Sequence, residues 1–347
     1  MTNYIPFLKT KTNEFACLKA LKPEIAENIT PFFDIHRKIE MYSEDEYIHI
    51  IDFVYKKINK NLQHFKLFYL DDFSIDDDLL IYGKQSYNYV IEKFQDFNFI
   101  PVIGIDRKPE RNEAVFNNKK ILQNDTIALQ VSIEDIQTGL TDLRELIIEA
   151  NEYFDKIELV IDLQFISQDE DINQLFSIID SFLKRNIFNF SKIIITGSSI
   201  PKLIGDIIAT DSTKDIPRRE LELFSILASN YANLYYGDYT LLSPFYSDLE
   251  VDPTMFPNIT TAKVIYAYEN RFFLIRGGSI KSKGFIQYKS LCDTISSKPF
   301  FRGGTYSYGD YFIENAQSYS KNIMPGTILA PTMNAHISYM YKDFLTL

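Results

Sequence analysis

The chain has 347 residues, of which 47 are acidic and 36 basic, so its formal net charge is −11. This charge opposes extensive non-specific contact with nucleic acid or an anionic membrane, although it is compatible with a local basic pocket. Hydrophobic residues make up 46% of the chain and include 28 Phe and 23 Tyr but no Trp. A folded protein with a large core is expected, with room for one barrel and an additional segment.

The two cysteines, Cys17 and Cys292, lie far apart in sequence and within apolar helical patterns. They predict buried free thiols rather than a disulfide, which fits a reducing cytoplasm. The first residues lack the basic-then-apolar pattern of a signal peptide, and no apolar run approaches the ~20 residues of a membrane span. We therefore expect a cytoplasmic protein with no membrane association.

Short apolar strands alternate with helical patterns along the first 242 residues, and several strands end on charged or hydroxyl residues. Strands are predicted at 4–11, 29–34, 66–72, 99–107, 126–132, 157–164, 192–199 and 234–239. A short apolar helix is predicted after Glu14, and further helices are predicted at 44–62, 82–94, 140–154, 172–183 and 218–229. This alternation predicts the α/β class and a (β/α)₈ TIM-type barrel over residues 1–242. An open doubly wound sheet is the competing architecture, because strand count alone does not prove closure.

The pattern changes after Leu242. Residues 262–268 and 272–278 predict an antiparallel hairpin, with its turn at Glu269 and Asn270, and residues 288–295 predict a short helix. The remainder is rich in Gly, Ser, Tyr and Asn and is expected to form polar loops. We interpret residues 243–347 as a hairpin-containing C-terminal extension packed on the barrel.

Several short motifs occur together in one order along the chain. They are Tyr4-Ile5-Pro6 with Lys9, Lys11 and Glu14; Pro31 with Asp34; Arg219-Glu220; Gly237-Asp238-Tyr239 with Pro244; Arg276-Gly277; Ser307-Tyr308-Gly309-Asp310; and His336-Ile337. In order and spacing they resemble the beta protein family, and the resemblance covers essentially the whole chain. The combination is specific, although each motif alone is weak.

The resemblance implies a connection with phage-host conflict, since the family is named for a phage-encoded beta protein and also occurs in bacteria. It assigns no catalytic residue. The chain departs from the family pattern in three respects: Asp34 stands where a Glu is usual, the extension has no Trp, and Ala335-His336 replaces a histidine pair. A metal or acid/base role of that pair is therefore not carried over to His336, and a histidine with no catalytic task is its default interpretation.

Two lysines, Lys9 and Lys11, share a side of the first predicted strand with Ile5 and Phe7, so both are expected to point inward near the barrel mouth. Lys9 is a catalytic candidate, because a lysine there can hold a phosphate or carboxylate or, with a lowered pKa, act on a carbonyl. Lys11 is a candidate ligand-binding residue. The alternative for both is a structural ion pair with Glu14 or Asp34, and for Lys11 this alternative is favoured.

Aspartates stand at or just after five of the predicted strands: Asp34, Asp71, Asp106, Asp162 and Asp238. A ring of carboxylates at one mouth would bind a divalent cation or supply an acid/base pair. Asp is also a common N-cap residue of the following helix, and this role is favoured for Asp71 and Asp106. Asp34, Asp162 and Asp238 remain as catalytic candidates.

The seventh strand ends in Thr196-Gly197-Ser198-Ser199, a run of small polar residues that would form an anion cradle. Ser198 and Ser199 are therefore candidate ligand-binding residues, although such turns are also ordinary capping sequences. Arg276, from the extension, is a candidate anion clamp over the mouth, and Arg107 is a further one. Salt bridges to the surplus acids are favoured for Arg302.

Two hypotheses of function follow from these patterns, and no motif decides whether the protein is an enzyme. In the first, the barrel mouth binds a phosphorylated or nucleotide-like anionic ligand and hydrolyses it with carboxylates and a divalent cation. In the second, the barrel is a non-catalytic scaffold that docks a partner protein in an antiphage defence or counter-defence assembly through Tyr306, Tyr308, Tyr311 and Phe312. Nucleic-acid binding is disfavoured by the net charge.

Overall fold

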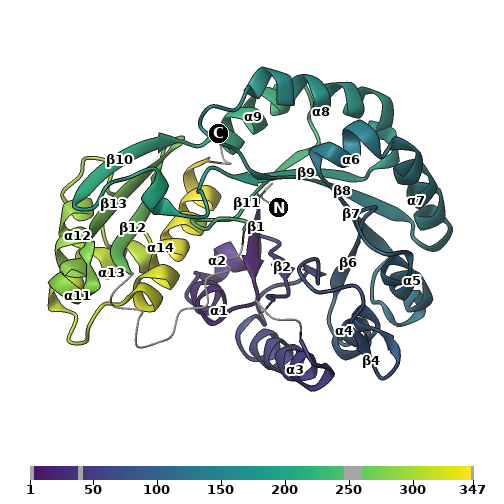
Figure 1. Cartoon of the computed structure of the whole chain (residues 1–347), viewed down its shortest axis with the longest axis horizontal. Helices are drawn as coiled ribbons and strands as arrows, with labels where there is room; N and C mark the ends of the chain where they lie inside the picture. The colour runs from purple at the N-terminus through teal and green to yellow at the C-terminus, as the bar shows by residue number, and fades with distance from the viewer. Residues whose placement is uncertain (1–3, 38–41, 246–259, 345–347) are drawn as a thin grey trace.

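A computed structural model describes residues 4–37, 42–245 and 260–344. Eight parallel strands close a barrel in the order β1-β11-β9-β8-β7-β6-β3-β2. Figure 1 shows this barrel surrounded by helices, with the C-terminal extension on one side. The prediction of a (β/α)₈ barrel is confirmed, and the open doubly wound sheet is excluded because β1 pairs with both β2 and β11.

Each barrel strand coincides with a predicted one. The strands are β1 (Tyr4–Lys9), β2 (Phe32–Asp34), β3 (Phe68–Asp71), β6 (Phe99–Ile103), β7 (Thr126–Val131), β8 (Lys156–Phe165), β9 (Lys192–Ser198) and β11 (Leu234–Asp238). Two further short strands, β4 (Leu80–Ile81) and β5 (Lys84–Gln85), form a small antiparallel pair outside the barrel. Parallel strands buried on both faces read as continuous apolar runs, which is why the sequence located them well.

Helices follow the strands around the barrel. They are α1 (Thr12–Lys19), α2 (Pro23–Ala26), α3 (Glu44–Asn61), α4 (Ser86–Phe94), α5 (Pro109–Asn117), α6 (Ile133–Thr138), α7 (Leu140–Tyr153), α8 (Ile172–Asn186) and α9 (Arg219–Ala228). Local capping fixes several of their starts. The Ser43 hydroxyl and the Glu46 carboxylate form a capping box at α3, and Asp171 caps α8 by accepting from two backbone amides. The predicted helices are confirmed as α1, α3, α4, α7, α8 and α9, whereas α2, α5 and α6 were not identified.

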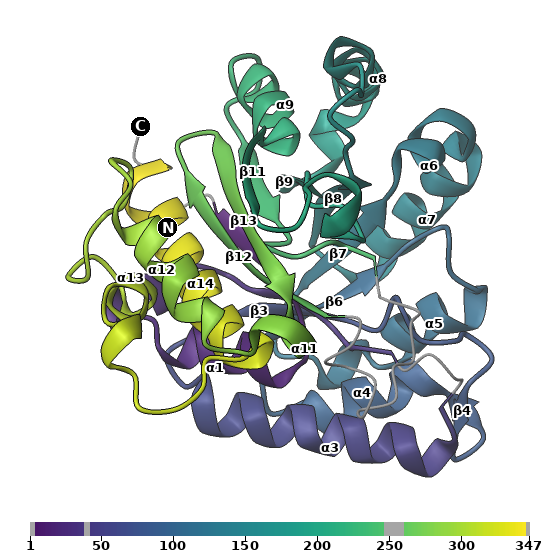
Figure 2. The ribbon, with the colours of Figure 1, turned by 60° about the vertical axis from the view of Figure 1, so that its left-hand side comes forward.

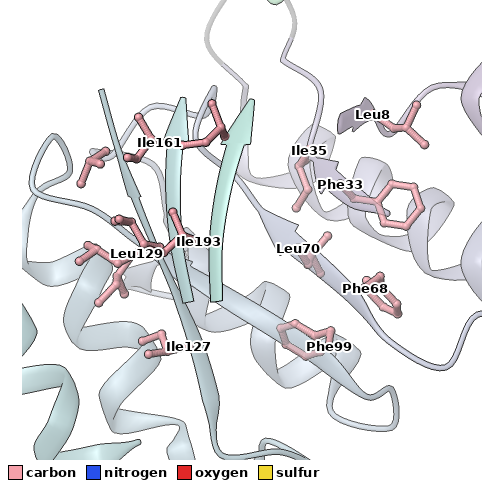
Figure 3. Packing of buried hydrophobic residues seen from close by; sticks show 14 of the residues in the cluster. Leu8, Phe33, Ile35, Phe68, Leu70, Phe99, Ile127, Leu129, Ile161 and Ile193 are labelled. Carbon is pink, nitrogen blue, oxygen red and sulfur yellow. The ribbon is translucent and has the colours of Figure 1, made fainter. Parts of the chain in front are cut away.

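Side chains alternate between the two faces of each barrel strand. The outer face carries apolar residues that pack against the helices, among them Phe33, Phe68, Leu129 and Ile161 (Figure 3). The inner face fills the barrel with a second apolar cluster formed by Ile5, Phe7, Phe32, Tyr69, Ile100, Val102, Ala128, Val160 and Ile194. The interior of the barrel is therefore a packed core.

The extension contains the predicted hairpin, formed by β12 (Thr261–Tyr268) and β13 (Arg271–Ser279). A third strand, β10 (Ser212–Pro217), pairs antiparallel with β13 and comes from the segment between β9 and α9. This strand was not predicted, because it is polar and carries no apolar alternation. It ties the extension to a loop of the barrel.

Helices complete the extension: α11 (Ile280–Lys283), α12 (Gln287–Ser296), α13 (Tyr308–Glu314) and α14 (Pro325–Tyr339). The expectation of polar loops after residue 295 was therefore wrong for α13 and α14. Figure 2 shows α14 beside the β12–β13 hairpin, and it also contacts α1. Met333, Ile337 and Met340 belong to the barrel core, whereas Ile328 and Ala335 belong to the extension core. Because α14 is buried on several sides, it lacks the one-sided apolar pattern that reveals a surface helix.

Two further expectations concern individual residues and helices. Cys17 and Cys292 are both buried and unpaired, which confirms the prediction of free thiols. None of the helices within the described ranges is long and apolar enough to cross a membrane.

Candidate functional site at the barrel mouth

A cavity of about 310 Å³ opens at the end of the barrel where the strands terminate. Aromatic side chains form much of its wall, including Phe7, Phe32, Tyr239 and Phe245. The polar groups that line it are Lys9, Asp34, Arg37, Asp71, Ser74, Gln130 and Gln164. In (β/α)₈ barrels this end is the one at which active sites form, so the cavity is the candidate site.

One side of the mouth holds a lysine and an aspartate on neighbouring strands. Lys9 is directly opposite Asp34 in the parallel ladder of β1 and β2. The Ser74 hydroxyl donates to Asp34 Oδ2 (3.2 Å). Burial lowers the pKa of Lys9 to about 8, against the opposing effect of Asp34. A cationic amine with a lowered pKa therefore lies beside a carboxylate at the cavity wall.

The opposite side of the mouth is crossed by a chain of hydrogen bonds. Arg107 Nη2 donates to Asp71 Oδ2 (2.7 Å) and to Gln130 Oε1 (3.1 Å). Gln130 Nε2 in turn donates to Asp162 Oδ2 (2.9 Å), and the Tyr239 hydroxyl donates to the same oxygen (2.6 Å). We call these five side chains the mouth network. It joins β3, β7, β8 and the residues that follow β6 and β11, so it fixes the relative positions of polar groups far apart in sequence.

Asp162 is the central carboxyl of the mouth network, and it is buried. Its Oδ1 accepts from the backbone amide of Gln164 (2.9 Å). Burial raises the pKa of Asp162, although the hydrogen bonds from Tyr239, Gln164 and Gln130 oppose the shift. Such a carboxyl retains its proton to a higher pH than an exposed aspartate does.

The backbone is irregular where these residues meet the cavity. Between Asp162 and Phe165, β8 advances one residue more than β9, so the strand carries a bulge. Gln164, within the bulge, has a φ of 50°, and Thr240, next to Tyr239, has a φ of 57°. Non-glycine residues seldom adopt this left-handed region, and such conformations concentrate at functional sites. The bulge turns Gln164 toward the cavity.

Beneath the mouth network lies a second layer of buried charge. Arg111 donates to Asp71 Oδ1 (2.5 Å) and to Asp72 Oδ1 (2.7 Å), and its guanidinium stacks over the Tyr87 ring. Asp71 is thus held between two arginines, with Arg107 on its other oxygen. The carboxylates that were predicted to cap helices here are instead paired with guanidinium groups.

Asp238, a predicted catalytic residue, does not share this cavity. Its carboxylate lies on the outer side of β11, where it accepts from the Tyr4 hydroxyl and Arg218 Nη2 (both 2.8 Å) and lies 2.8 Å from His336 Nε2. Burial opposes its ionisation, but His336 and Arg218 outweigh burial and lower the pKa of Asp238. The side chain joins the barrel to α14. The expectation that it faces the mouth is corrected, because Asp238 and the mouth-facing Tyr239 are successive residues that point to opposite faces.

The predicted ligand-binding residues also lie outside the mouth cavity. The Ser198 hydroxyl donates to the carbonyl of Leu242, and the Ser199 hydroxyl donates to Glu220. Arg276 donates to Thr261 Oγ1 and to the carbonyl of Ile208, within the extension and the segment before β10. Lys11 lines a second, neighbouring cavity. Of the predicted site residues, Lys9 and Asp34 line the mouth cavity, whereas Asp162 does not line it and is hydrogen-bonded to two residues that do, Gln130 and Tyr239.

The sequence interpretation did not identify Gln130, Gln164 and Tyr239 as part of the mouth, and it favoured a different role for Asp71. For Asp71 and Gln130, the alternation of side chains along the strand indicated that they face inward. Each of Asp71 and Gln130 stands two residues after an inward-facing side chain, Tyr69 and Ala128 respectively. Gln164 had no such signal, because the bulge breaks the alternation.

Among the residues that the structure describes, no group of three or more His, Cys, Asp or Glu side chains is arranged to hold a metal ion. The divalent cation suggested by the aspartates remains a prediction from the sequence.

Comparison with known proteins gives one match. A family model described as "Beta protein" matches residues 4–342, which is nearly the whole chain. No curated protein matches the chain. The matched residues span both the barrel and the extension.

Proposed function

The chain belongs to the beta protein family, and from the geometry of its barrel mouth we propose that it binds a small phosphorylated or nucleotide-like anion there. The observation that carries this proposal is the composition of the mouth cavity. A cationic Lys9, hydrogen-bonding side chains and an aromatic wall line one cavity of a size typical of small-molecule sites.

Each part of the cavity has a counterpart in such a ligand. The Lys9 ammonium pairs with an anionic group, as lysine does in many phosphate sites. Phe7, Phe32 and Tyr239 present ring surfaces to a planar base. Gln130 and Gln164 offer amide donors and acceptors to its edge. The net charge of −11 does not oppose this binding, because recognition of a small anion depends on local charge.

Hydrolysis of the bound anion is the reaction that the proposal includes. Asp162 does not line the cavity, so it would exchange a proton with the attacking water or the leaving oxygen through the Tyr239 hydroxyl, which lines the cavity and donates to Asp162. Asp34, beside Lys9 in the ladder, would orient the amine. These catalytic roles of Lys9, Asp34 and Asp162 are proposals, as is a divalent cation bound together with the ligand.

Isothermal titration calorimetry with nucleoside mono-, di- and triphosphates, inorganic phosphate and the corresponding nucleosides tests the binding, each with and without Mg²⁺. Lys9→Ala should lower the affinity for phosphate-containing ligands by about tenfold or more, which is the effect of losing one charged hydrogen bond. The same substitution should leave the affinity for a nucleoside nearly unchanged. Release of phosphate by the wild type and its loss in Asp162→Ala would establish hydrolysis.

Lys192→Ala is a matched control, since Lys192 is a partly buried barrel lysine at the opposite end, paired with Glu158. It should leave ligand affinity unchanged while circular dichroism verifies the fold of each variant. If the wild type binds none of these compounds, the proposal is refuted. Equal loss of affinity in Lys9→Ala and Lys192→Ala would place the effect in folding rather than in binding.

A role in phage-host conflict is also proposed, supported by the phage and bacterial distribution of the family. Plaque formation on host cells that produce wild type, Lys9→Ala or Lys192→Ala tests whether the mouth is involved. A change in plating efficiency with the wild type that Lys9→Ala abolishes and Lys192→Ala retains is expected. No effect of the wild type on any phage tested would remove this part of the proposal.

The second candidate function is a scaffold that docks a partner protein through α13. Its supporting observation is that Tyr308 and Tyr311, three residues apart on one helix face, are 46% and 58% exposed. Phe312 instead packs in the extension core, and Tyr306 donates to Asp343. Co-purification from infected cells should retain a defined partner with the wild type and lose it with Tyr308→Ser/Tyr311→Ser. Retention by that double variant would count against docking on α13.

A further inference from the structure

A second cavity, of about 380 Å³, lies beside the mouth between the barrel and the extension. Its barrel side is formed by residues that follow β1, β9 and β11, and its other side by β12, α12 and the first turns of α14. Aliphatic side chains dominate the wall: Ile200, Ile204, Leu241, Ile265, Ile328 and Leu329. It therefore differs from the mouth cavity, whose wall is largely aromatic.

Cationic side chains surround this aliphatic wall. The lysines that line the cavity are Lys9, Lys11, Lys202 and Lys263, and the carboxyl that lines it is Glu14. Lysines thus outnumber carboxylates among the described lining residues. Because long-range attraction follows the local balance of charge, the cavity favours an anion over a cation.

Lys263 is the lysine best placed to recognise an anion. It follows an irregularity in the pairing of β12 with β13, and its ladder neighbour Arg276 donates to Thr261 and Ile208. Within the described part of the chain, the Lys263 ammonium has no hydrogen-bond or ion-pair partner. Lys263 keeps more than a third of its surface exposed, and partial desolvation together with the Arg276 charge lowers its pKa. A bound anion would oppose both effects.

A phenol hydroxyl provides a second polar group. Tyr288, on α12, lines the cavity, and its hydroxyl is buried close to the Lys263 backbone. That hydroxyl forms no hydrogen bond of acceptable geometry with any described residue. A buried donor without a partner is costly, so an acceptor oxygen from a ligand would stabilise it.

We propose that this cavity binds a single-chain amphiphile: an alkyl chain against the aliphatic wall and an anionic headgroup at Lys263 and Tyr288. The volume lies within the range of small-molecule sites, and burial of each CH₂ group of the chain favours binding. The headgroup chemistry is that of a carboxylate or a phosphate monoester, both of which accept from an ammonium and a phenol. This proposal does not rest on the ligand of the barrel mouth.

Calorimetric titration with decanoate and decyl phosphate tests the proposal, beside decanol and acetate as probes that lack the charge or the chain. Saturable binding of an anionic decyl probe is expected, with decanol and acetate at least about tenfold weaker. Comparison of decanoate with decyl phosphate identifies the preferred headgroup. Absence of saturable binding below the concentration at which the probes self-associate would overturn the proposal, as would equal binding of decanol.

Two substitutions locate the probe. Lys263→Gln should weaken the anionic probe by about tenfold, and Leu329→Ser should weaken it by removing apolar wall. Lys281→Gln, an exposed lysine of the same extension, is the control and should have no effect, while circular dichroism verifies folding. An unchanged affinity in Lys263→Gln would refute the assignment. It would also be refuted if a mouth variant such as Gln130→Ala lost binding while Leu329→Ser retained it, because the probe would then bind at the mouth.

Discussion

At the scale of single residues, ionisable groups buried near the barrel mouth hold unusual pKa values. Glu14, in the first turn of α1, is 2% exposed, and burial raises its pKa to about 7, against the opposing effects of a backbone hydrogen bond, Lys11 and Lys9. Burial lowers the pKa of Lys9 to about 8. Both groups lie at the second cavity and Lys9 also at the first. The charge at this end of the barrel therefore changes over the neutral pH range.

Glu14→Gln should alter how stability depends on pH. The folded-state pKa of Glu14 lies above its usual value of 4.5, so the folded state binds the proton more tightly than the unfolded state. The free energy of unfolding of the wild type should therefore fall as pH rises from about 5 to about 8, by roughly 3 kcal/mol from this group. Urea unfolding at pH 5, 6.5 and 8 should show a smaller decline in Glu14→Gln.

The exposed Glu149→Gln, on α7, is the control and should retain the wild-type decline. If Glu14→Gln and the wild type lose stability equally between pH 5 and pH 8, the raised pKa of Glu14 is refuted.

Gly104 makes room for the mouth network. A Cβ atom at this position would lie 2.1 Å from Arg107 Nη1 and 3.1 Å from the carbonyl oxygen of Gln130. Gly104→Ala should therefore displace the Arg107 guanidinium from Asp71 and cost about 3 kcal/mol, as expected for breaking a buried ion pair. Denaturant unfolding measures the loss. Gly326→Ala, where a Cβ meets nothing within 4 Å, should be neutral, and equal effects of the two would contradict this account.

At the scale of elements, α14 joins the barrel to the extension through a buried polar cluster. Arg218 Nε donates to Glu220, and its Nη2 donates to Asp238 and to the Tyr236 hydroxyl. His336, on α14, approaches the same Asp238. Groups from β11, α14 and the residue that precedes α9 thus meet at one carboxylate. The cluster orients α14 on the barrel, because removal of any member leaves buried charge without its partner.

Asp238→Asn distinguishes a structural role of this residue from a role at the mouth. The substitution leaves His336 without its carboxylate and Arg218 with Glu220 as its remaining carboxylate, and it should cost about 3 kcal/mol of stability. At a temperature where the variant remains folded, its affinity for the mouth ligand should equal that of the wild type. Asp162→Asn should instead lose ligand affinity and retain most of its stability. Thermal unfolding and calorimetric titration of both variants provide the measurements. Loss of ligand affinity without loss of stability in Asp238→Asn would restore the residue to the site.

At the scale of the whole molecule, the barrel and the extension share cores. Met333, Ile337 and Met340 pack in the barrel core although they belong to the last helices of the described chain. In the other direction, β10 leaves the barrel to pair with β13. The boundary proposed between residues 242 and 243 therefore separates segments that bury each other's apolar surface.

The barrel segment alone should not fold cooperatively. Residues 1–242 lack α14 and the partner strand of β10, so apolar side chains of the barrel core would be exposed to water. Near-ultraviolet circular dichroism and calorimetry should show no cooperative transition for this fragment, and addition of a separately produced 243–347 segment should restore one. A fragment 1–242 that melts cooperatively by itself would show that the barrel is an independent domain.

The sequence alone predicted the strands of the barrel, most of its long helices and the hairpin of the extension. Those features depend on local patterns: buried parallel strands are apolar throughout, and surface helices show one apolar face. Repetition of the strand-helix unit indicated a barrel, and the pairing of β1 with both β2 and β11 decided that it is closed. It missed β10 and α14, because a polar strand and a helix buried on several sides lack these patterns.

The site was only partly predictable. Lys9 and Asp34 stand at strand ends and line the mouth cavity, so position along the chain located them, whereas Asp162 contacts the lining residue Gln130. Which of two successive residues faces inward depends on the register of the strand. Tyr239 lies at the mouth, whereas Asp238, the preceding residue, contacts α14. The bulge of β8 and the contacts from Arg107 through Gln130 to Asp162 join residues from separate strands. The sequence by itself determined the barrel and the residues at its strand ends, whereas the tertiary structure decided which side chains share a cavity, because barrel closure sets the register between strands.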